Sequence, residues 1–137
     1  LLIGDESLGE RIGKIPRARI IAGATVCDDP LQVVSGCAKA TASLMSQENL
    51  TPEGVDLFEL HEAFAATSIK CQRDLGISHE KLNVNGGVIA LGHPMGATGG
   101  IMMGTLLDEL ERRDLKTGIV AASGAAGSGT AILIERL

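Results

Sequence analysis

The clearest periodic pattern of apolar and polar positions lies between residues 101 and 113. Apolar side chains recur at helical spacing, at Ile101 or Met102 and then at Leu106 and Leu110. On the opposite face, the acidic residues at 108 and 109 each precede an arginine by four positions, the order in which such pairs stabilise a helix. The pattern predicts an amphipathic helix with Asp108–Arg112 and Glu109–Arg113 ion pairs.

Shorter apolar runs indicate the other elements. Strands are expected at 1–4, 18–25, 55–60, 118–122 and 130–134, and helices at 8–12, 30–47 and 65–75. The strand at 18–25 reads as buried, and the last two strands form an antiparallel hairpin. Asp29 with Pro30 starts one helix, Ser7 caps the short one, and Gly76 ends another. This order is typical of an α/β layer with crossover connections and one antiparallel edge.

The stretch from Asn83 to Gly104 is dense in glycine and holds one histidine, His93. Glycine adds no packing and costs backbone entropy, so this density indicates a backbone that turns sharply or approaches a ligand closely. The stretch leads into a helix N-terminus, which favours negative charge on a ligand or intermediate. Its spacing fits neither the dinucleotide fingerprint nor the phosphate loop. From this stretch alone, His93 is either catalytic or a satisfied core histidine.

Two further groups of unusual residues lie at the ends of predicted strands. His61 and Glu62 follow the strand at 55–60, a strand-to-helix junction of the kind where α/β sheets place functional groups. The run 123–129 contains only small residues and joins the two strands of the hairpin. The structural alternatives are a solvated helix start and a crowded turn. Because His93 also falls near a strand end, the three groups are candidates to converge on one site.

Composition narrows the class of protein. With 137 residues, 45% of them hydrophobic, the chain has the size of one ordinary domain. A net charge of -5 and the absence of Trp and Tyr argue against a nucleic-acid surface. Cys27, Cys37 and Cys71 leave one thiol unpaired in any disulfide scheme and lack metal-ligand spacing, so we expect reduced thiols, no metal and a cytoplasmic protein. No apolar run reaches the roughly 18 residues of a membrane span, so no membrane partner is expected.

Three motifs together resemble the C-terminal domain of the thiolases. They are His61-Glu62-Ala63-Phe64-Ala65, the block from Asn83-Val84-Asn85-Gly86-Gly87 to Gly92-His93-Pro94-Met95-Gly96-Ala97-Thr98-Gly99, and the glycine-rich C-terminal hairpin. The resemblance covers residues 16–137 and points to the subset that reads His-Glu-Ala-Phe. It implies a thiolase-like α/β fold, with a mixed sheet covered by helices. Residues 14–137 would be the C-terminal domain and residues 1–13 the end of the N-terminal one.

The resemblance also implies an activity and a set of partners. Thiolases are acyltransferases that cleave a 3-ketoacyl-CoA with CoA or condense acetyl-CoA, in fatty acid metabolism. In the family a cysteine of the N-terminal half takes up the acyl group, so that half is an expected partner, and the chain, which opens without Met, is expected to be a piece of something larger. Coenzyme A acts as a co-substrate and no cofactor is expected. The full-length protein is expected to be a homodimer or tetramer.

Family roles carry over to three residues. His93 is similar to the histidine that activates the nucleophilic thiol and helps to bind the thioester oxygen. Such a group is needed because a thiol with a pKa of about 8.5 is only a few per cent ionised at neutral pH. His61 stands where many members have Asn, which implies a hydrogen bond to the enolate oxygen in an oxyanion hole. Phe64 matches the position that lines the acyl pocket.

One position departs from the family pattern. Members usually carry a second cysteine in the last hairpin, in a Cys-x-Gly-Gly-Gly pattern, where it moves the proton on and off the α-carbon. Here that position is Ser123, followed by Gly124 and Ala125 at the second oxyanion hole. Loss of a positioned acid or base costs on the order of 10²–10⁴ in rate. Three alternatives remain: weakened condensation, an altered reaction, or a non-catalytic acyl-CoA-binding or scaffold protein.

Overall fold

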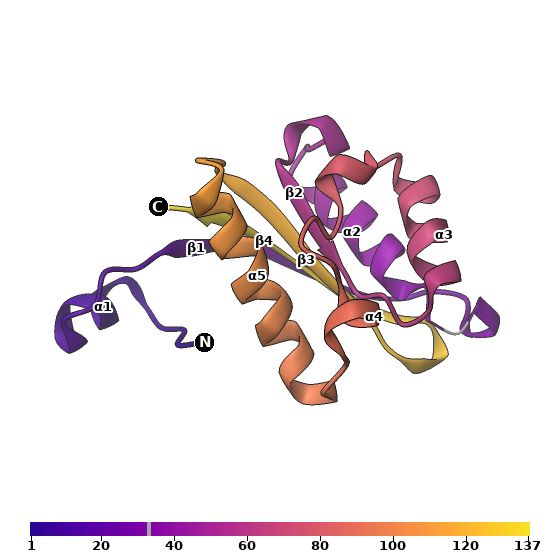
Figure 1. Ribbon diagram of the computed structural model, residues 1–137, viewed down its shortest axis with the longest axis horizontal. Helices are drawn as coiled ribbons and strands as arrows, with labels where there is room; N and C mark the ends of the chain where they lie inside the picture. Colours follow the sequence, from indigo (N-terminus) through magenta and orange to yellow (C-terminus); the bar gives the residue numbers. More distant parts are fainter. Residues whose placement is uncertain (33) are drawn as a thin grey trace.

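Four strands form one mixed sheet in the computed structural model, which describes residues 1–32 and 34–137 (Figure 1). The strands are β1 (Ala18–Cys27), β2 (Leu57–Leu60), β3 (Thr117–Ser123) and β4 (Ser128–Arg136). They lie in the order β1-β4-β3-β2, with β2 parallel to β3 and the other two pairs antiparallel. The predicted α/β class, the mixed sheet, the final hairpin and the antiparallel edge strand are confirmed.

Helices cover both faces of this sheet. The helices of the described residues are α1 (Glu6–Ile12), α2 (Gly36–Gln47), α3 (Ala65–Leu75), α4 (Val88–Leu91) and α5 (Thr98–Arg112). Short 3-10 turns lie at 30–32, 52–54, 79–81, 95–97 and 125–127. Helices α2 and α3 pack side by side over one face and α5 over the other, whereas α1 lies apart from the sheet (Figure 1).

Apolar side chains of the two central strands, β3 and β4, point alternately to the two faces of the sheet and so contribute to two separate apolar cores. Successive residues of a strand point to opposite faces, so Ile119 and Leu133 join the core under α2 and α3, while Val120 and Ile134 join the core under α5. The apolar face predicted for α5 is confirmed, because its periodic leucines are buried in the second core. The sheet is therefore held between two apolar layers, and its strand ends lie free to carry a site.

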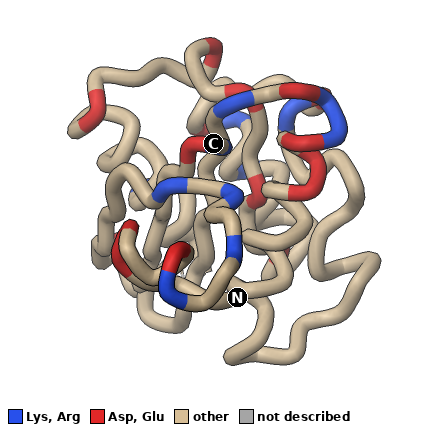
Figure 2. Tube along the Cα trace, turned by 90° about the vertical axis from the view of Figure 1, so that its left-hand side faces the viewer, with Lys and Arg blue, Asp and Glu red and all other residues tan. Residues whose placement is uncertain are grey.

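The acidic residues of α5 pair differently from the prediction. Glu109 does contact Arg113, as predicted. The partner of Asp108 is Arg17, at 2.5 Å, and Arg112 turns instead to Glu109, at 2.6 Å. Arg17 precedes β1 directly, a proximity that helical spacing cannot reveal. Figure 2 shows acidic and basic segments next to one another near the C-terminus.

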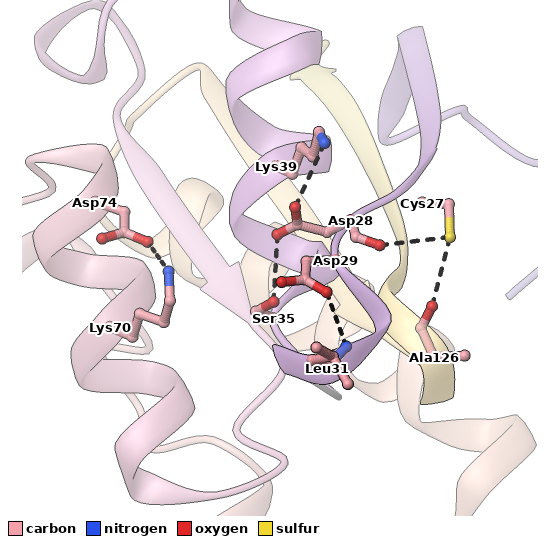
Figure 3. Close-up of polar contacts among 9 residues, drawn as sticks. All are labelled: Cys27, Asp28, Asp29, Leu31, Ser35, Lys39, Lys70, Asp74 and Ala126. Carbon is pink, nitrogen blue, oxygen red and sulfur yellow. Dashed lines mark hydrogen bonds and ion pairs between the residues drawn. The ribbon is translucent and has the colours of Figure 1, made fainter.

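The helix predicted at 30–47 is shorter in the structure. Residues 30–32 form a separate 3-10 turn, and α2 starts only afterwards; Val33 lies outside the described residues. A carboxylate oxygen of Asp29 accepts a hydrogen bond from the amide of Leu31, 3.0 Å away, which closes a tight local turn (Figure 3). The Asp-Pro start signal was correct for a turn and wrong for the long helix.

Strand β1 is not the buried strand that was predicted. Ile20 is 47% exposed and Ile21 is 42% exposed, and only Ala24 is buried. The strand is at the edge of the sheet and pairs with β4 alone. Small apolar residues identify a strand but do not reveal whether another element covers it.

The first residues also differ from the prediction. Residues 1–4, all of which the structure describes, form no strand. Helix α1 begins after Asp5, and Ser7 lies inside it, donating its hydroxyl to the Asp5 carboxylate at 2.7 Å. Gly13, with a φ of 64°, ends the helix.

Candidate active site

The parallel pairing of β2 and β3 brings two of the predicted site residues to one edge of the sheet. His61 directly follows β2, and its amide donates to the carbonyl of Ala121 in β3 at 2.9 Å, which extends the ladder by one residue. Ser123 is the last residue of β3. The carboxyl ends of neighbouring parallel strands therefore present an imidazole and a hydroxyl at the same edge.

His61 is buried without hydrogen-bond partners. Its side chain is 5% exposed, and among the described residues neither Nδ1 nor Nε2 has a partner. Burial lowers its pKa below the usual value and the nearby His93 lowers it further, against opposing effects from the Ser123 backbone and Glu62. His61 is thus a neutral imidazole at neutral pH. Buried ring nitrogens left unpaired are costly, so they indicate a partner that a ligand or a water would supply.

His93 lies against His61. The ring centroids are 4.5 Å apart and the rings are tilted by 47°. His93 is exposed, and its Nδ1 is 2.7 Å from the hydroxyl oxygen of Thr98, the buried first residue of α5. This bond fixes one ring nitrogen and leaves Nε2 for a reactant. The predicted convergence of His61 and His93 is therefore present in the structure.

Two residues to which the sequence analysis gave no catalytic or binding role, Asn83 and Glu62, hold the glycine-rich loop in place. The side chain of Asn83 accepts from the amide of Leu60 at 2.8 Å and donates to the carbonyl of the same residue at 2.9 Å. It also donates to the carboxylate of Glu62 at 3.0 Å, and the other oxygen of that carboxylate accepts from the amide of Ile89 at 3.1 Å. A Cβ at Gly87 would lie 2.4 Å from this carboxylate, so a larger residue there would displace the Glu62 side chain from these hydrogen bonds. The sequence signal that could have identified them is their place in the motifs, since Glu62 lies in the His-Glu-Ala-Phe motif and Asn83 opens the glycine-rich block.

Beneath this loop lies a buried acid, Glu59 of β2. Its side chain is 3% exposed and lines a small cavity with Thr98 and Met102. Burial, and secondarily the charge of Glu62, raises the pKa of Glu59 to about 8. At neutral pH Glu59 is mostly protonated and adds little negative charge to the site.

The hairpin loop after β3 is tightly folded. The hydroxyl oxygen of Ser123 accepts a hydrogen bond from the amide of Cys37 at 2.9 Å. The amide of Gly124 donates across the loop to the carbonyl of Ser128 at 2.8 Å. Ala126 has a φ of 56°, and its carbonyl accepts from the Cys27 thiol at 3.4 Å (Figure 3). The amide of Cys37 therefore fixes the position of the Ser123 hydroxyl oxygen at the edge of the site.

Residues 14–136 match the family described as the C-terminal domain of thiolase. The chain belongs to the thiolase family. It is 40% identical over its whole length to a 3-ketoacyl-CoA thiolase of Cronobacter sakazakii and 37% identical to an acetyl-CoA acetyltransferase of Allochromatium vinosum. The crystal structure of the Bacillus anthracis acetyl-CoA acetyltransferase matches 96% of the chain with a TM-score of 0.90 and 36% identity.

This thiolase chain spans about a third of the length of those relatives. It covers 36% of the first, 35% of the second and 34% of the crystallised chain. The pattern matches what the three sequence motifs implied, namely a thiolase C-terminal region. Activity, substrates and partners are properties of the whole proteins, of which this chain is about a third.

The remaining predicted site residues lie at the edges of the site. Phe64 precedes α3 and is 64% exposed, so in the described part of the chain it lines no enclosed acyl pocket. Gly124 is partly buried and Ala125 is exposed at the loop surface. Among the described residues there is no cluster of three metal-ligating side chains, and no helix is long and apolar enough to cross a membrane.

Proposed function

We propose that this chain supplies the C-terminal part of the active site of a thiolase-type acyltransferase, which cleaves a 3-ketoacyl-CoA or condenses acetyl-CoA. The observation that carries the proposal is the pair of imidazoles 4.5 Å apart, one of them buried with both ring nitrogens unpaired among the residues that the structure describes. Support also comes from the printed names of the relatives, a 3-ketoacyl-CoA thiolase and an acetyl-CoA acetyltransferase.

His93 acts in this proposal as the base that activates the nucleophilic thiol of the N-terminal half. Thr98 holds Nδ1, so Nε2 takes the thiol proton and the thiolate attacks the acyl carbon. The acyl group moves to the enzyme sulfur, and the leaving group departs as CoA when an acyl-CoA is the donor or as the enolate of acetyl-CoA when a 3-ketoacyl-CoA is cleaved. Residues 1–13 are then the end of the N-terminal half.

His61 stabilises the enolate oxygen. A neutral imidazole donates one hydrogen bond without carrying a charge of its own, and burial keeps His61 neutral. Ser123 stands at the position from which the α-proton is transferred, and the amides of Gly124 and Ala125 form the second oxyanion hole. Phe64 lines the acyl pocket once the other half covers it. The substrates are acyl-CoA and CoA, and the complete protein is a cytoplasmic homodimer or tetramer.

A second candidate is an acyl-CoA-binding protein of the same fold that forms no carbon–carbon bond. Ser123 favours it, because a serine hydroxyl is a much weaker acid than a thiol and by itself suits proton transfer poorly. The two candidates differ in one measurable step. Exchange of the α-protons of acetyl-CoA with solvent requires the proton transfer, whereas binding alone does not.

The test compares two histidine variants in the complete enzyme that contains this chain. His93→Ala is expected to lower the rate at which acyl-CoA acylates the nucleophile by more than about 10²-fold, because a base and an oxygen ligand are lost together. His61→Ala is expected to slow α-proton exchange more than acylation. The control is His79→Ala, which removes an exposed histidine of the same chain and leaves both rates unchanged.

Two results would contradict the proposal. If His93→Ala acylates at the rate of the unmodified enzyme, His93 is not the base. If acylation is intact in every variant but no α-proton exchange occurs in the unmodified enzyme, the acyl-CoA-binding alternative is favoured.

A further inference from the structure

The start of α2 lies in direct backbone contact with the start of β4. A Cβ at Gly36 would lie 2.2 Å from the carbonyl oxygen of Ser128, and a Cβ at Gly129 would lie 2.1 Å from the carbonyl oxygen of Gly36. Only glycine at both positions permits this approach. It sets the N-terminus of a buried helix against the hairpin that carries Ser123, and the next residue of the helix is Cys37.

Three side chains then form a row from the site into the core. The Cys37 amide donates to the Ser123 hydroxyl oxygen at 2.9 Å, and the Ser123 side chain lies close enough to the Cys37 thiol to lower its pKa. Behind it, the sulfur of Cys37 is 3.1 Å from the sulfur of Cys71 on α3. Both cysteines are fully buried, whereas Ser123 is half-buried at the strand end. Ser123 therefore lies between the edge of the site and the buried Cys37.

The surroundings of Cys37 favour its thiolate form. It is the second residue of a 12-residue helix, where the helix dipole stabilises negative charge. The hydrogen bond from Cys71 and, to a smaller extent, the Ser123 side chain together lower the pKa of Cys37 to about 7, against the effect of burial. The same contact raises the pKa of Cys71 far above the usual value, so Cys71 remains the protonated donor.

We infer that the Cys37 thiolate is the proton acceptor behind Ser123, so that the hydroxyl and the thiolate together do what a single cysteine does in other thiolases. The inference deepens the proposed function and rests on it. By this arrangement Cys37 is a positioning residue that acts through Ser123. It explains why a serine is tolerated at the position of proton transfer.

The proton balance of the step is simple. The Cα–H bond of the acyl-CoA breaks, its electron pair stays on the substrate as the enolate, and the proton moves to the Ser123 oxygen. In the same step the original hydroxyl proton of Ser123 moves to the Cys37 sulfur. One C–H bond and one O–H bond break, one O–H bond and one S–H bond form, and the negative charge passes from sulfur to the enolate oxygen. Protonation of the enolate runs through the same bonds in reverse.

A first experiment measures the thiol itself, independently of activity. The S–H stretching band in the infrared spectrum is followed against pH in the unmodified protein, in Cys71→Ala and in Ser123→Ala. We expect a buried thiol that titrates close to neutral pH and a shift of that titration to higher pH when either donor is removed. The control is Thr41→Val, a substitution of similar shape at a fully buried residue of the same helix whose hydroxyl has no hydrogen-bond partner in the described part of the chain. Titration of all buried thiols well above neutral pH would overturn the inference.

A second experiment measures α-proton exchange on acetyl-CoA against pH in the complete enzyme. Cys37→Ser keeps the size and a hydroxyl for Ser123 but cannot form an anion near neutral pH. We expect it to slow exchange by at least about tenfold and to remove the rise of rate around neutral pH, while the nucleophile is acylated as before. Ser123→Cys should restore exchange in the Cys37→Ser background, because a thiol at the site then acts directly. Thr41→Val should exchange normally.

The outcomes separate the two hypotheses. If the unmodified enzyme exchanges α-protons and Cys37→Ser does so with the same rate and pH profile, Cys37 is only a packing residue and the relay is wrong, while the proposed function stands. If the unmodified enzyme exchanges none, the proposed function fails and the relay fails with it.

Discussion

Glu59→Gln should make the protein more stable at alkaline pH and leave its stability at acidic pH almost unchanged. Glu59 is buried beneath the glycine-rich loop, and its pKa rises from the ordinary 4.5 to about 8. The folded protein therefore holds a proton on Glu59 that the unfolded chain has already released. Since the unfolded state then binds fewer protons than the folded state, stability falls as pH rises from 4.5 to about 8. Above that range the loss is complete.

The gap between the two pKa values sets the size of the effect. At about 1.4 kcal/mol per pH unit, it corresponds to at most about 5 kcal/mol of unfolding free energy. Water entry and relaxation around an ionised carboxylate reduce this, so about 2 kcal/mol is the smallest difference that we expect. Glutamine has the shape of the protonated acid and cannot ionise, so the variant lacks this loss.

The assay is denaturant unfolding of both proteins at a series of pH values from about 5 to about 9. Carboxylates elsewhere titrate equally in both, so the difference between the two curves isolates Glu59. A matched control is Glu80→Gln, on an exposed residue, which should follow the unmodified protein at every pH. If the Glu59→Gln and unmodified curves stay parallel over the whole range, Glu59 is ionised in the folded protein and the reasoning is wrong.

Two further predictions concern the packing and the loop. Leu110→Ala removes a fully buried side chain between α5 and the sheet and should lower the unfolding free energy by about 2–5 kcal/mol, measured by denaturant unfolding. Ile15→Ala, at a residue 91% exposed, should leave the unfolding free energy almost unchanged. A loss below about 1 kcal/mol at Leu110 would mean that this core is loosely packed. Glu62→Ala frees Asn83 and the amide of Ile89, so acylation of the complete enzyme should slow while its global stability changes little. Equal acylation rates with and without the Glu62 side chain would show that the hydrogen bonds of Glu62 to Asn83 and Ile89 do not position His93.

The elements that the sequence predicted well are those governed by local pattern. The apolar period of α5, the glycine that ends α3 and the small-residue turn of the hairpin each depend on neighbours within a few residues. The meeting of His61 and Ser123 followed from a topological rule, since residues at the carboxyl ends of parallel strands meet at one edge of a sheet. His93 follows α4 instead of a strand, so its contact with His61 depends on the path of the glycine-rich loop, and the strand-end position expected for it was wrong.

What the sequence did not predict depends on contacts between distant segments. Asp108 pairs with Arg17, 91 residues away, and the helix predicted from Pro30 starts late, where Gly36 meets β4. The exposure of β1 depends on what covers the sheet, which a strand pattern does not encode. The contact between Cys37 and Ser123 is of the same kind, because it joins residues 86 positions apart through backbone packing.

Burial controls the charge of the site. It holds His61 neutral by lowering its pKa and holds Glu59 protonated by raising its pKa, so neither group adds a fixed charge near neutral pH. In the proposed reaction the negative charge then moves only between the Cys37 sulfur and the enolate oxygen. A second anion beside the enolate would oppose that movement, which gives a physical reason for a buried, protonated glutamate below the site. The same low polarity strengthens the hydrogen bond that His61 donates to the enolate.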